Sequence, residues 1–282
     1  MNAKSTNWLK RTRRPVLMLA GGYVAIVVVM MFLEKSLIFH PRSGGNWTPW
    51  HADVEDVWLT TSDGVQIHGW YFDHPNPKSV ILFAHGNAGN LTGRADTMDR
   101  IRRVTESAVF IFDYRGYGKS QGKPDEAGIL LDARAAQAWV AQRTGIAENQ
   151  VTLMGRSLGT GVMVDLAASE GAKGLILESA FTSLPDTAAR HYPWLPVRWV
   201  MRTQLDSAAK IDNYTGPLLM SHGDADNVVP YTLGRRLFEL APSKQKLFVS
   251  LPGADHNDPQ TAAYYDELQA FVDSISLRPI AD

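Results

Sequence analysis

The sequence predicts an α/β domain with a mainly parallel sheet and an antiparallel start, preceded by one membrane-spanning helix. Two observations lead to this fold class. Continuous apolar runs alternate with helical patterns along most of the chain, as expected for strands buried on both faces of a parallel sheet. An uncharged apolar segment precedes this alternation. The length of 282 residues, with 45% hydrophobic and 20% charged residues, suits one globular domain plus an anchor.

The apolar segment covers residues 15–33, PVLMLAGGYVAIVVVMMFL. As a helix it would reach about 28 Å, close to a hydrocarbon core of about 30 Å. We therefore expect a basic tail over residues 1–14 and a transmembrane anchor over residues 15–33. A cleaved signal peptide is the alternative, but its apolar region is usually about 7 to 15 residues long and precedes a small-residue cleavage site. Here the sequence EKSLIF follows instead.

Charge around the anchor predicts its orientation. Five basic residues and no acidic residue precede it, whereas Glu34, Lys35 and Arg42 follow it. The basic residues are Lys4, Lys10, Arg11, Arg13 and Arg14. Because loops rich in lysine and arginine stay in the cytoplasm, we expect a cytoplasmic N-terminus and an extracytoplasmic domain, which is periplasmic in a diderm bacterium.

Composition excludes several classes of function. The net charge of −1 gives no basic excess for binding a nucleic-acid backbone. The absence of cysteine excludes disulfides, thiolate metal sites and a cysteine nucleophile. Few histidines are grouped at ligand spacing, so we expect no metal site. No cofactor is expected. Oligomeric state has no signature in the sequence.

The elements follow in order after a juxtamembrane segment over residues 34–53. Residues 54–60 and 65–72 flank an Asp63-Gly64 turn and predict an antiparallel hairpin. Six apolar runs predict further strands, at residues 80–84, 108–112, 151–154, 175–177, 218–220 and 247–251. Helical patterns cover residues 91–103, 126–142, 158–169, 231–240 and 261–276. Residues 181–211 are too long for a simple connection and predict a short helical cap, within a domain that spans residues 54–278.

The sharpest chemical signal is the segment Gly155-Arg156-Ser157-Leu158-Gly159, a G-x-S-x-G pattern where an apolar run ends and a helical pattern begins. In that setting the serine occupies a strained turn that projects its hydroxyl above the sheet, and the glycines let strand and helix approach. The five-residue pattern alone occurs by chance in many proteins. Its position between strand and helix favours Ser157 as a nucleophile.

A serine hydroxyl needs a base and a residue that orients the base. Asp226, in HGDADNVVP, and His256, in GADHN, each follow an apolar run, at the edge where parallel sheets build their sites. We predict His256 as the base and Asp226 as the acid. Asp224 remains an alternative acid, and Asp255 and Asp258 are expected to be solvated loop carboxylates. The remaining histidines without a glycine-rich strand-end context are expected at the surface or in packing; they are His40, His51, His68, His74 and His191.

The segment HGNAGN follows the run that ends at Ala84, where this architecture places one oxyanion donor. We predict the backbone N–H groups of Asn87 and Leu158 as the oxyanion hole. His85 is expected to pack and to shape this loop. The glycine-rich segment 113–120, DYRGYGKS, lacks the ending of a nucleotide-binding loop and is expected to shape the pocket wall.

The ordered segments SLIFHP, HGNAGN, DYRGYGKS, LMGRSLGTG, LESAFTSL, HGDADNVVP and GADHND resemble the α/β-hydrolase superfamily, and within it the Bem46-like hydrolases. The resemblance extends over residues 36–271 and implies an α/β-hydrolase fold with Ser157, Asp226 and His256 as the triad. It also implies an N-terminal hydrophobic anchor. The related eukaryotic depalmitoylating enzymes have cysteine-rich N-termini, whereas this chain has no cysteine.

We expect a membrane-anchored serine hydrolase that cleaves carboxylic ester or thioester bonds through an acyl-enzyme. A small-molecule or lipid acyl substrate would be its partner. Apolar cap residues would either line an entrance for such a substrate or pack the cap onto the sheet; they are Tyr192, Trp194, Leu195, Val197, Trp199 and Val200. The alternative function is a catalytically silent, membrane-anchored scaffold. Dehalogenation or epoxide opening would require an aspartate at the position of Ser157.

Overall fold

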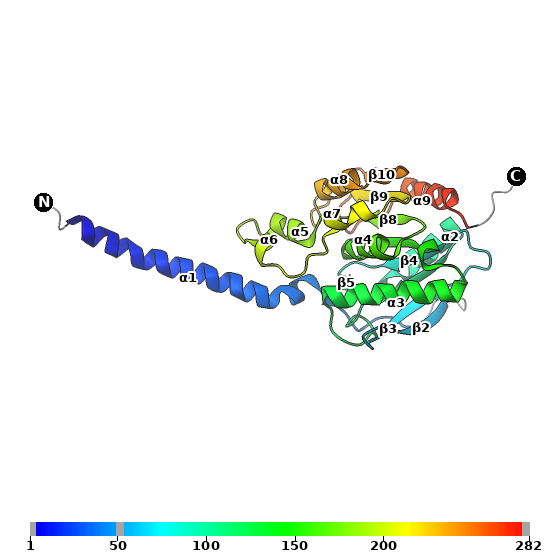
Figure 1. Ribbon diagram of the computed structural model, residues 1–282, viewed down its shortest axis with the longest axis horizontal. Coiled ribbons are helices and arrows are strands. Elements are labelled where there is room, and N and C mark those ends of the chain that lie inside the picture. Colours follow the sequence, from blue (N-terminus) through cyan, green and yellow to red (C-terminus); the bar gives the residue numbers. More distant parts are fainter. Residues whose placement is uncertain (1–3, 49–53, 278–282) are drawn as a thin grey trace.

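The computed structural model describes residues 4–48 and 54–277, so His51 and the predicted domain end at residue 278 lie outside the described residues. The central sheet of this part has eight strands in the order β10-β9-β8-β7-β4-β6-β3-β2 (Figure 1). The strands are β2 (Val54–Thr60), β3 (Gln66–Phe72), β4 (Val80–Ala84), β6 (Ala108–Phe112), β7 (Thr152–Arg156), β8 (Leu175–Glu178), β9 (Leu218–Gly223) and β10 (Lys246–Leu251). Only the pairings of β3 with β2 and β6 are antiparallel. The predicted fold class is confirmed.

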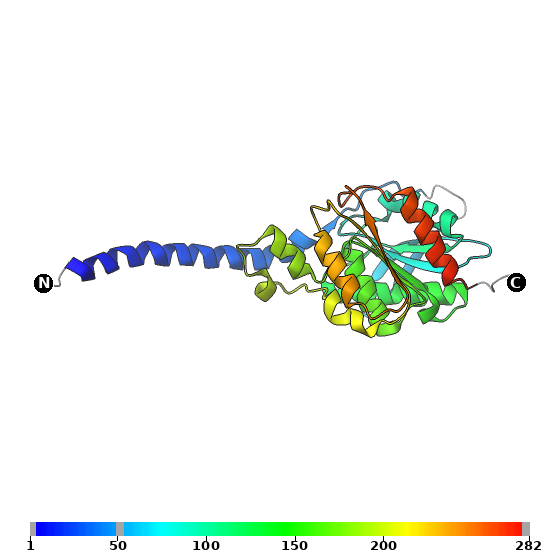
Figure 2. The same ribbon diagram turned by 90° about the horizontal axis from the view of Figure 1, so that it is seen from above.

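Helices cover both faces of the sheet (Figure 2). They are α2 (Ala95–Thr105), α3 (Glu126–Thr144), α4 (Leu158–Glu170), α8 (Tyr231–Leu240) and α9 (Ala262–Ser274). One core cluster joins the sheet to α3, α4 and α8, and a second joins its other face to α2 and α9. Every residue of β4 and β6 is buried, which explains their continuous apolar runs.

A pair of two-residue strands has no counterpart in the predictions. β1 (His40–Pro41) pairs in parallel with β5 (Ala88–Gly89). This pairing fixes the chain that follows the N-terminal helix to the loop that follows β4. Strands this short carry no periodic pattern, so only the folded chain reveals them.

The segment over residues 181–211 contains α5 (Leu184–His191), α6 (Val197–Val200) and α7 (Ser207–Lys210). The Ser183 side chain caps α5 by accepting a hydrogen bond from the Asp186 N–H. Helices α5 and α6 project from the body and lie beside the C-terminal part of the N-terminal helix in both views (Figures 1 and 2). We refer to residues 181–211 as the cap.

The N-terminal helix α1 (Lys4–Ile38) has 35 residues and extends beyond the predicted anchor at both ends. Its stretch Arg14–Ile38 is the one helix in the described part of the chain that is long and apolar enough to cross a membrane. Residues 34–38, expected in a juxtamembrane segment, form its last turn, where the Glu34 carboxylate accepts hydrogen bonds from backbone N–H groups of the cap. Phe39 then enters the core of the domain, with 3% of its surface exposed.

Candidate active site

Ser157 lies at the sharp turn between β7 and α4, with φ 52° and ψ −120°. A positive φ is strained for a residue with a Cβ atom and recurs at functional turns. The flanking glycines make this turn sterically possible. A Cβ atom at Gly159 would collide with the carbonyl oxygen of Ala84, and one at Gly155 would collide with the carbonyl oxygen of Gly159. The local sequence thereby lifts the Ser157 hydroxyl above the end of the sheet.

The structure brings Ser157, His256 and Asp226 together from the ends of three strands. His256 Nε2 lies 3.0 Å from Ser157 Oγ, and His256 Nδ1 lies 2.7 Å from Asp226 Oδ2. Both distances allow hydrogen bonds. The side chains therefore form a continuous path for a proton from the hydroxyl to the imidazole, with a carboxylate behind the ring.

Asp226 is held as a carboxylate. Its Oδ1 accepts hydrogen bonds from the backbone N–H groups of Val228, at 2.9 Å, and Val229, at 2.7 Å. Burial acts to raise the pKa of Asp226, but hydrogen bonds from His222 and His256 outweigh it and hold that pKa well below its usual range. The negative charge stabilises a protonated His256 ring.

The alternative acid, Asp224, points elsewhere. Its Oδ1 accepts a hydrogen bond from the Gly253 N–H at 2.6 Å. Asp255 and Asp258 lie in a solvent-accessible loop, as expected, and they also accept backbone hydrogen bonds. Asp255 accepts hydrogen bonds from the N–H groups of Asn227, at 3.0 Å, and His256, at 2.6 Å, and Asp258 accepts one from the Asp255 N–H at 2.8 Å. Asp255 thereby connects the loop of Asp226 to the loop of His256, and Asp258 braces the second loop.

Two further residues hold Asp226 and His256 in place and were missed from the sequence. Arg156 donates from Nη2 to the backbone carbonyl of His256 at 2.9 Å, and its Nη1 lies 3.6 Å from Glu178. His222 lies 3.3 Å from Asp226 and donates to the Val229 carbonyl at 2.9 Å. Two sequence features could have identified them. Arg156 directly precedes Ser157, and His222 is the first residue of HGDADNVVP.

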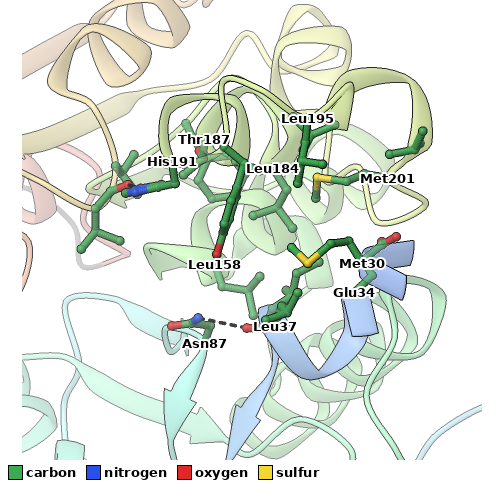
Figure 3. A pocket seen from close by; sticks show the side chains of 18 of the residues that line it. Met30, Glu34, Leu37, Asn87, Leu158, Leu184, Thr187, His191, Leu195 and Met201 are labelled. Atoms are coloured by element: carbon green, nitrogen blue, oxygen red, sulfur yellow. Dashed lines mark hydrogen bonds between the residues drawn. The ribbon is translucent and has the colours of Figure 1, made fainter. Parts of the chain in front are cut away.

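Asn87 and Leu158, the predicted oxyanion donors, line the same cavity as Ser157. The Asn87 side chain donates to the carbonyl of Ile38, at the end of α1, at 2.9 Å (Figure 3). His85 is fully buried, and its Nδ1 donates to the Gly86 carbonyl at 2.7 Å. It packs and shapes the loop, as expected.

The segment 113–120 does not line the cavity, so the expectation that it shapes the pocket wall is wrong. Its side chains support the HGNAGN loop from behind, because their hydroxyl groups point at backbone carbonyls. Tyr114 donates to the carbonyl of His85 at 2.9 Å, and Tyr117 donates to that of Asn87 at 2.8 Å. These bonds hold the loop that carries one predicted oxyanion donor.

A cavity of about 270 Å³ leads to Ser157 between the cap and α1 (Figure 3). The cap contributes Leu184, Leu195 and Met201, which face Met30 and Leu37 of α1. Of the six apolar cap residues predicted for an entrance, four line the cavity, namely Tyr192, Leu195, Val197 and Val200. Trp194 and Trp199 do not, and are 54% and 90% exposed.

His191, expected at the surface or in packing, lies in the cavity wall, and its Nε2 lies 2.8 Å from the carbonyl of Val228. The contact joins the cap to the loop that carries Asp226. Among the residues that the structure describes, no group of three or more histidine, cysteine or acidic side chains could hold a metal ion.

Comparison with known proteins places the chain in a family. Residues 75–208 match the family described as serine aminopeptidase, S33. The uncharacterized protein Rv2307c of Mycobacterium tuberculosis is 37% identical over 260 residues, covering 89% of this chain and 91% of that protein. The α/β-hydrolase domain-containing protein WAV2 of Arabidopsis thaliana is 31% identical over 264 residues, which cover 84% of this chain and 86% of that protein. The chain belongs to the α/β-hydrolase superfamily.

A further relative, lysophosphatidylserine lipase ABHD12 of Danio rerio, is 30% identical over 292 residues, which cover 84% of this chain and 74% of that protein. Among solved structures, the esterase PF2001 of Pyrococcus furiosus superposes with a TM-score of 0.69 at 20% identity. The superposition covers 84% of this chain and 96% of the esterase. The chain therefore shares the fold of this esterase.

Proposed function

We propose that this protein is a membrane-anchored serine hydrolase that cleaves carboxylic ester or thioester bonds of lipid-like acyl substrates through an acyl-enzyme. The observation that carries the proposal is the contact of His256 with both Ser157 and Asp226 at the end of an apolar cavity. The name of the relative ABHD12, a lysophosphatidylserine lipase, supports a lipid ester as the substrate. The active domain would lie outside the cytoplasm.

The proposed reaction has two halves. Ser157 Oγ attacks the carbonyl carbon while His256 Nε2 takes the hydroxyl proton, and the negative oxygen that forms is stabilised by the backbone N–H groups of Asn87 and Leu158. The intermediate collapses to an acyl-serine as the alcohol or thiol leaves with the proton from His256. Water then repeats the sequence as the nucleophile, which releases the carboxylic acid and restores Ser157.

A fluorophosphonate probe tests the proposal on the full-length protein in detergent. We expect a covalent adduct on the wild type and none on Ser157→Ala, together with loss of p-nitrophenyl ester hydrolysis in the variant. Ser36→Ala, a substitution outside the described cavity lining, is the control and should label like the wild type. A folded wild-type protein that does not label and does not turn over esters would identify the chain as a scaffold.

A further inference from the structure

One stripe of α1 forms a wall of the cavity. Val27, Met31, Glu34 and Ile38 line it at spacings of four, three and four residues, which place them on one side of a helix, and Met30 lines it beside Met31. Met30 and Glu34 face the cap residues Leu195 and Met201 across the cavity (Figure 3). The other side of α1 is open, with Phe32 84% exposed and Val29 54% exposed. The predicted anchor therefore contributes directly to the space in front of Ser157.

Three side chains of α1 fix this wall to the rest of the protein through four contacts. The buried carboxylate of Glu34 accepts hydrogen bonds from the backbone N–H groups of Arg202, at 3.0 Å, and Thr203, at 2.7 Å. The Tyr23 hydroxyl donates to the carbonyl of Trp194 at 2.9 Å, and Lys35 forms an ion pair with Asp125 at 3.1 Å. The helix and the cap are thus joined at both ends of the stripe, so α1 is more than a flexible tether.

The contact between Tyr23 of α1 and Trp194 of the cap also indicates how deep the cap lies in the bilayer. Tyr23 follows Arg14 by nine positions, which is about 14 Å of helix and less than half of a hydrocarbon core of about 30 Å. If charged Arg14 lies at one interface, the contact of Tyr23 with Trp194 lies near the middle of the bilayer. The tip of the cap then lies among lipid tails, where its exposed Trp194 is compatible with its surroundings.

The cavity runs along the same axis. Its catalytic end lies beside Ile38, whose carbonyl accepts the hydrogen bond from Asn87. From Ile38 to Val27 the wall covers about 16 Å of helix, directed towards the membrane interior. An acyl chain in the cavity would lie parallel to α1, and therefore parallel to the tails of the surrounding lipids.

We infer that the substrate is an ester of one long acyl chain that is dissolved in the bilayer, and that it enters sideways between α1 and the cap without leaving the membrane. Its carbonyl would reach Ser157 while its tail stays against Met30 and Met31. These two side chains of α1 determine chain-length specificity. The inference rests on the proposed function.

A substitution on each side of α1 tests the wall. In full-length protein reconstituted in nanodiscs, kcat/KM should rise from p-nitrophenyl acetate to octanoate by about fourfold for each buried methylene. Met30→Trp should lower the octanoate-to-acetate ratio at least tenfold, about the loss of two buried methylenes. Val29→Trp, on the open side, should keep that ratio within about twofold of the wild type. Met30→Ala should shift the preference to longer acyl chains. This variant provides the test if Met30→Trp does not fold.

The role of α1 in chain-length specificity would be overturned if Met30→Trp, Met30→Ala and Val29→Trp had equal octanoate-to-acetate ratios with acetate turnover intact. The proposed function would still stand. Absence of both ester turnover and fluorophosphonate labelling would overturn the proposed function and the inference with it.

Lipids brominated at the middle of their acyl chains test the depth of the cap, because bromine quenches tryptophan fluorescence at contact. The quenched component of the wild-type emission should shrink in Trp194→Phe. It should persist in Trp58→Phe, since Trp58 lies on β2, on the body of the domain. Equal quenching in Trp194→Phe and the wild type would overturn the placement of the cap among lipid tails.

Discussion

At the scale of single residues, the proposed chemistry depends on how firmly His256 is oriented. Its ring contacts Asp226 and Ser157, and its backbone carbonyl accepts a hydrogen bond from Arg156. A ring held from several directions needs little reorganisation when it takes a proton. We therefore expect both the side chains proposed to react and the residues that hold them to contribute to the rate.

Asp226→Asn should lower kcat by about 10⁴, because an amide cannot keep the His256 ring in the required tautomer. Steady-state hydrolysis of a p-nitrophenyl ester by the full-length protein measures this loss. Asp224→Asn is the matched control and should change kcat by less than about threefold, since Asp224 bonds to the Gly253 N–H instead. A larger loss in the control than in Asp226→Asn would assign the acid to Asp224.

The lowered pKa of Asp226 also predicts a pH dependence of stability. At a pH below 3.8, the ordinary pKa of an aspartate, the unfolded chain binds a proton at Asp226. The folded protein binds that proton only at a lower pH. The stabilisation from the carboxylate is therefore fully present above the ordinary pKa and is lost as the pH falls through the lower pKa of the folded state. Urea unfolding from pH 7 down to pH 3 should show the stability difference between wild type and Asp226→Asn shrinking below about pH 5. A difference that grows on acidification would contradict the assigned direction.

At the scale of elements, the junction of β7 and α4 depends on close contact between backbones. The first turn of α4 lies against the end of β4, so any side chain at Gly159 would displace one of them. The strained φ of Ser157 persists because both flanking elements are buried.

Gly159→Ala should lower the free energy of unfolding by about 1 to 3 kcal/mol, because its Cβ atom would collide with the Ala84 carbonyl. It should also reduce fluorophosphonate labelling by displacing Ser157. Gly93→Ala is the control. A Cβ atom there would meet nothing within 4 Å, so stability should change by less than about 0.5 kcal/mol. Urea unfolding of both variants measures the difference, and equal stability would show that the junction tolerates a side chain.

Elements were predictable where burial imposes a pattern. The predicted bounds of β4, β6 and α8 agree with the structure because each element is a complete apolar run or a complete amphipathic pattern. The pairing of β1 with β5 and the extension of α1 to Ile38 were not predicted. The first involves strands too short for periodicity, and the second depends on contacts with the cap.

At the scale of the whole molecule, the proposed anchor and the hydrolase body share one cavity. Under the proposed function, orientation in the membrane would decide which leaflet supplies the substrate. Basic residues before the apolar segment favour a cytoplasmic N-terminus, so the leaflet on the far side from the cytoplasm is expected to supply it.

Reporter fusions at the C-terminus test this orientation. A fusion to alkaline phosphatase, which is active only outside the cytoplasm, should show phosphatase activity. A fusion to green fluorescent protein, exported by the same route, should not fluoresce. Replacing Lys10, Arg11, Arg13 and Arg14 with glutamine should weaken the orientation and produce a mixed population, because the charge bias is reduced. Replacing the three arginines with lysine keeps the charge and should leave the orientation unchanged. A fluorescent wild-type fusion without phosphatase activity would place the domain in the cytoplasm.

The sequence by itself determined an α/β fold with a mainly parallel sheet, because strands buried on both faces require continuous apolar runs. The ordered motifs then carried the resemblance to the α/β-hydrolase superfamily. The sequence also singled out Ser157, Asp226 and His256, since each follows an apolar run, although their meeting depends on strand order. The tertiary structure alone showed α1 as a cavity wall and Arg156, His222 and His191 as supports. The contact of Tyr23 with Trp194 joins residues 171 positions apart, and a contact between such distant residues leaves no local pattern in the chain.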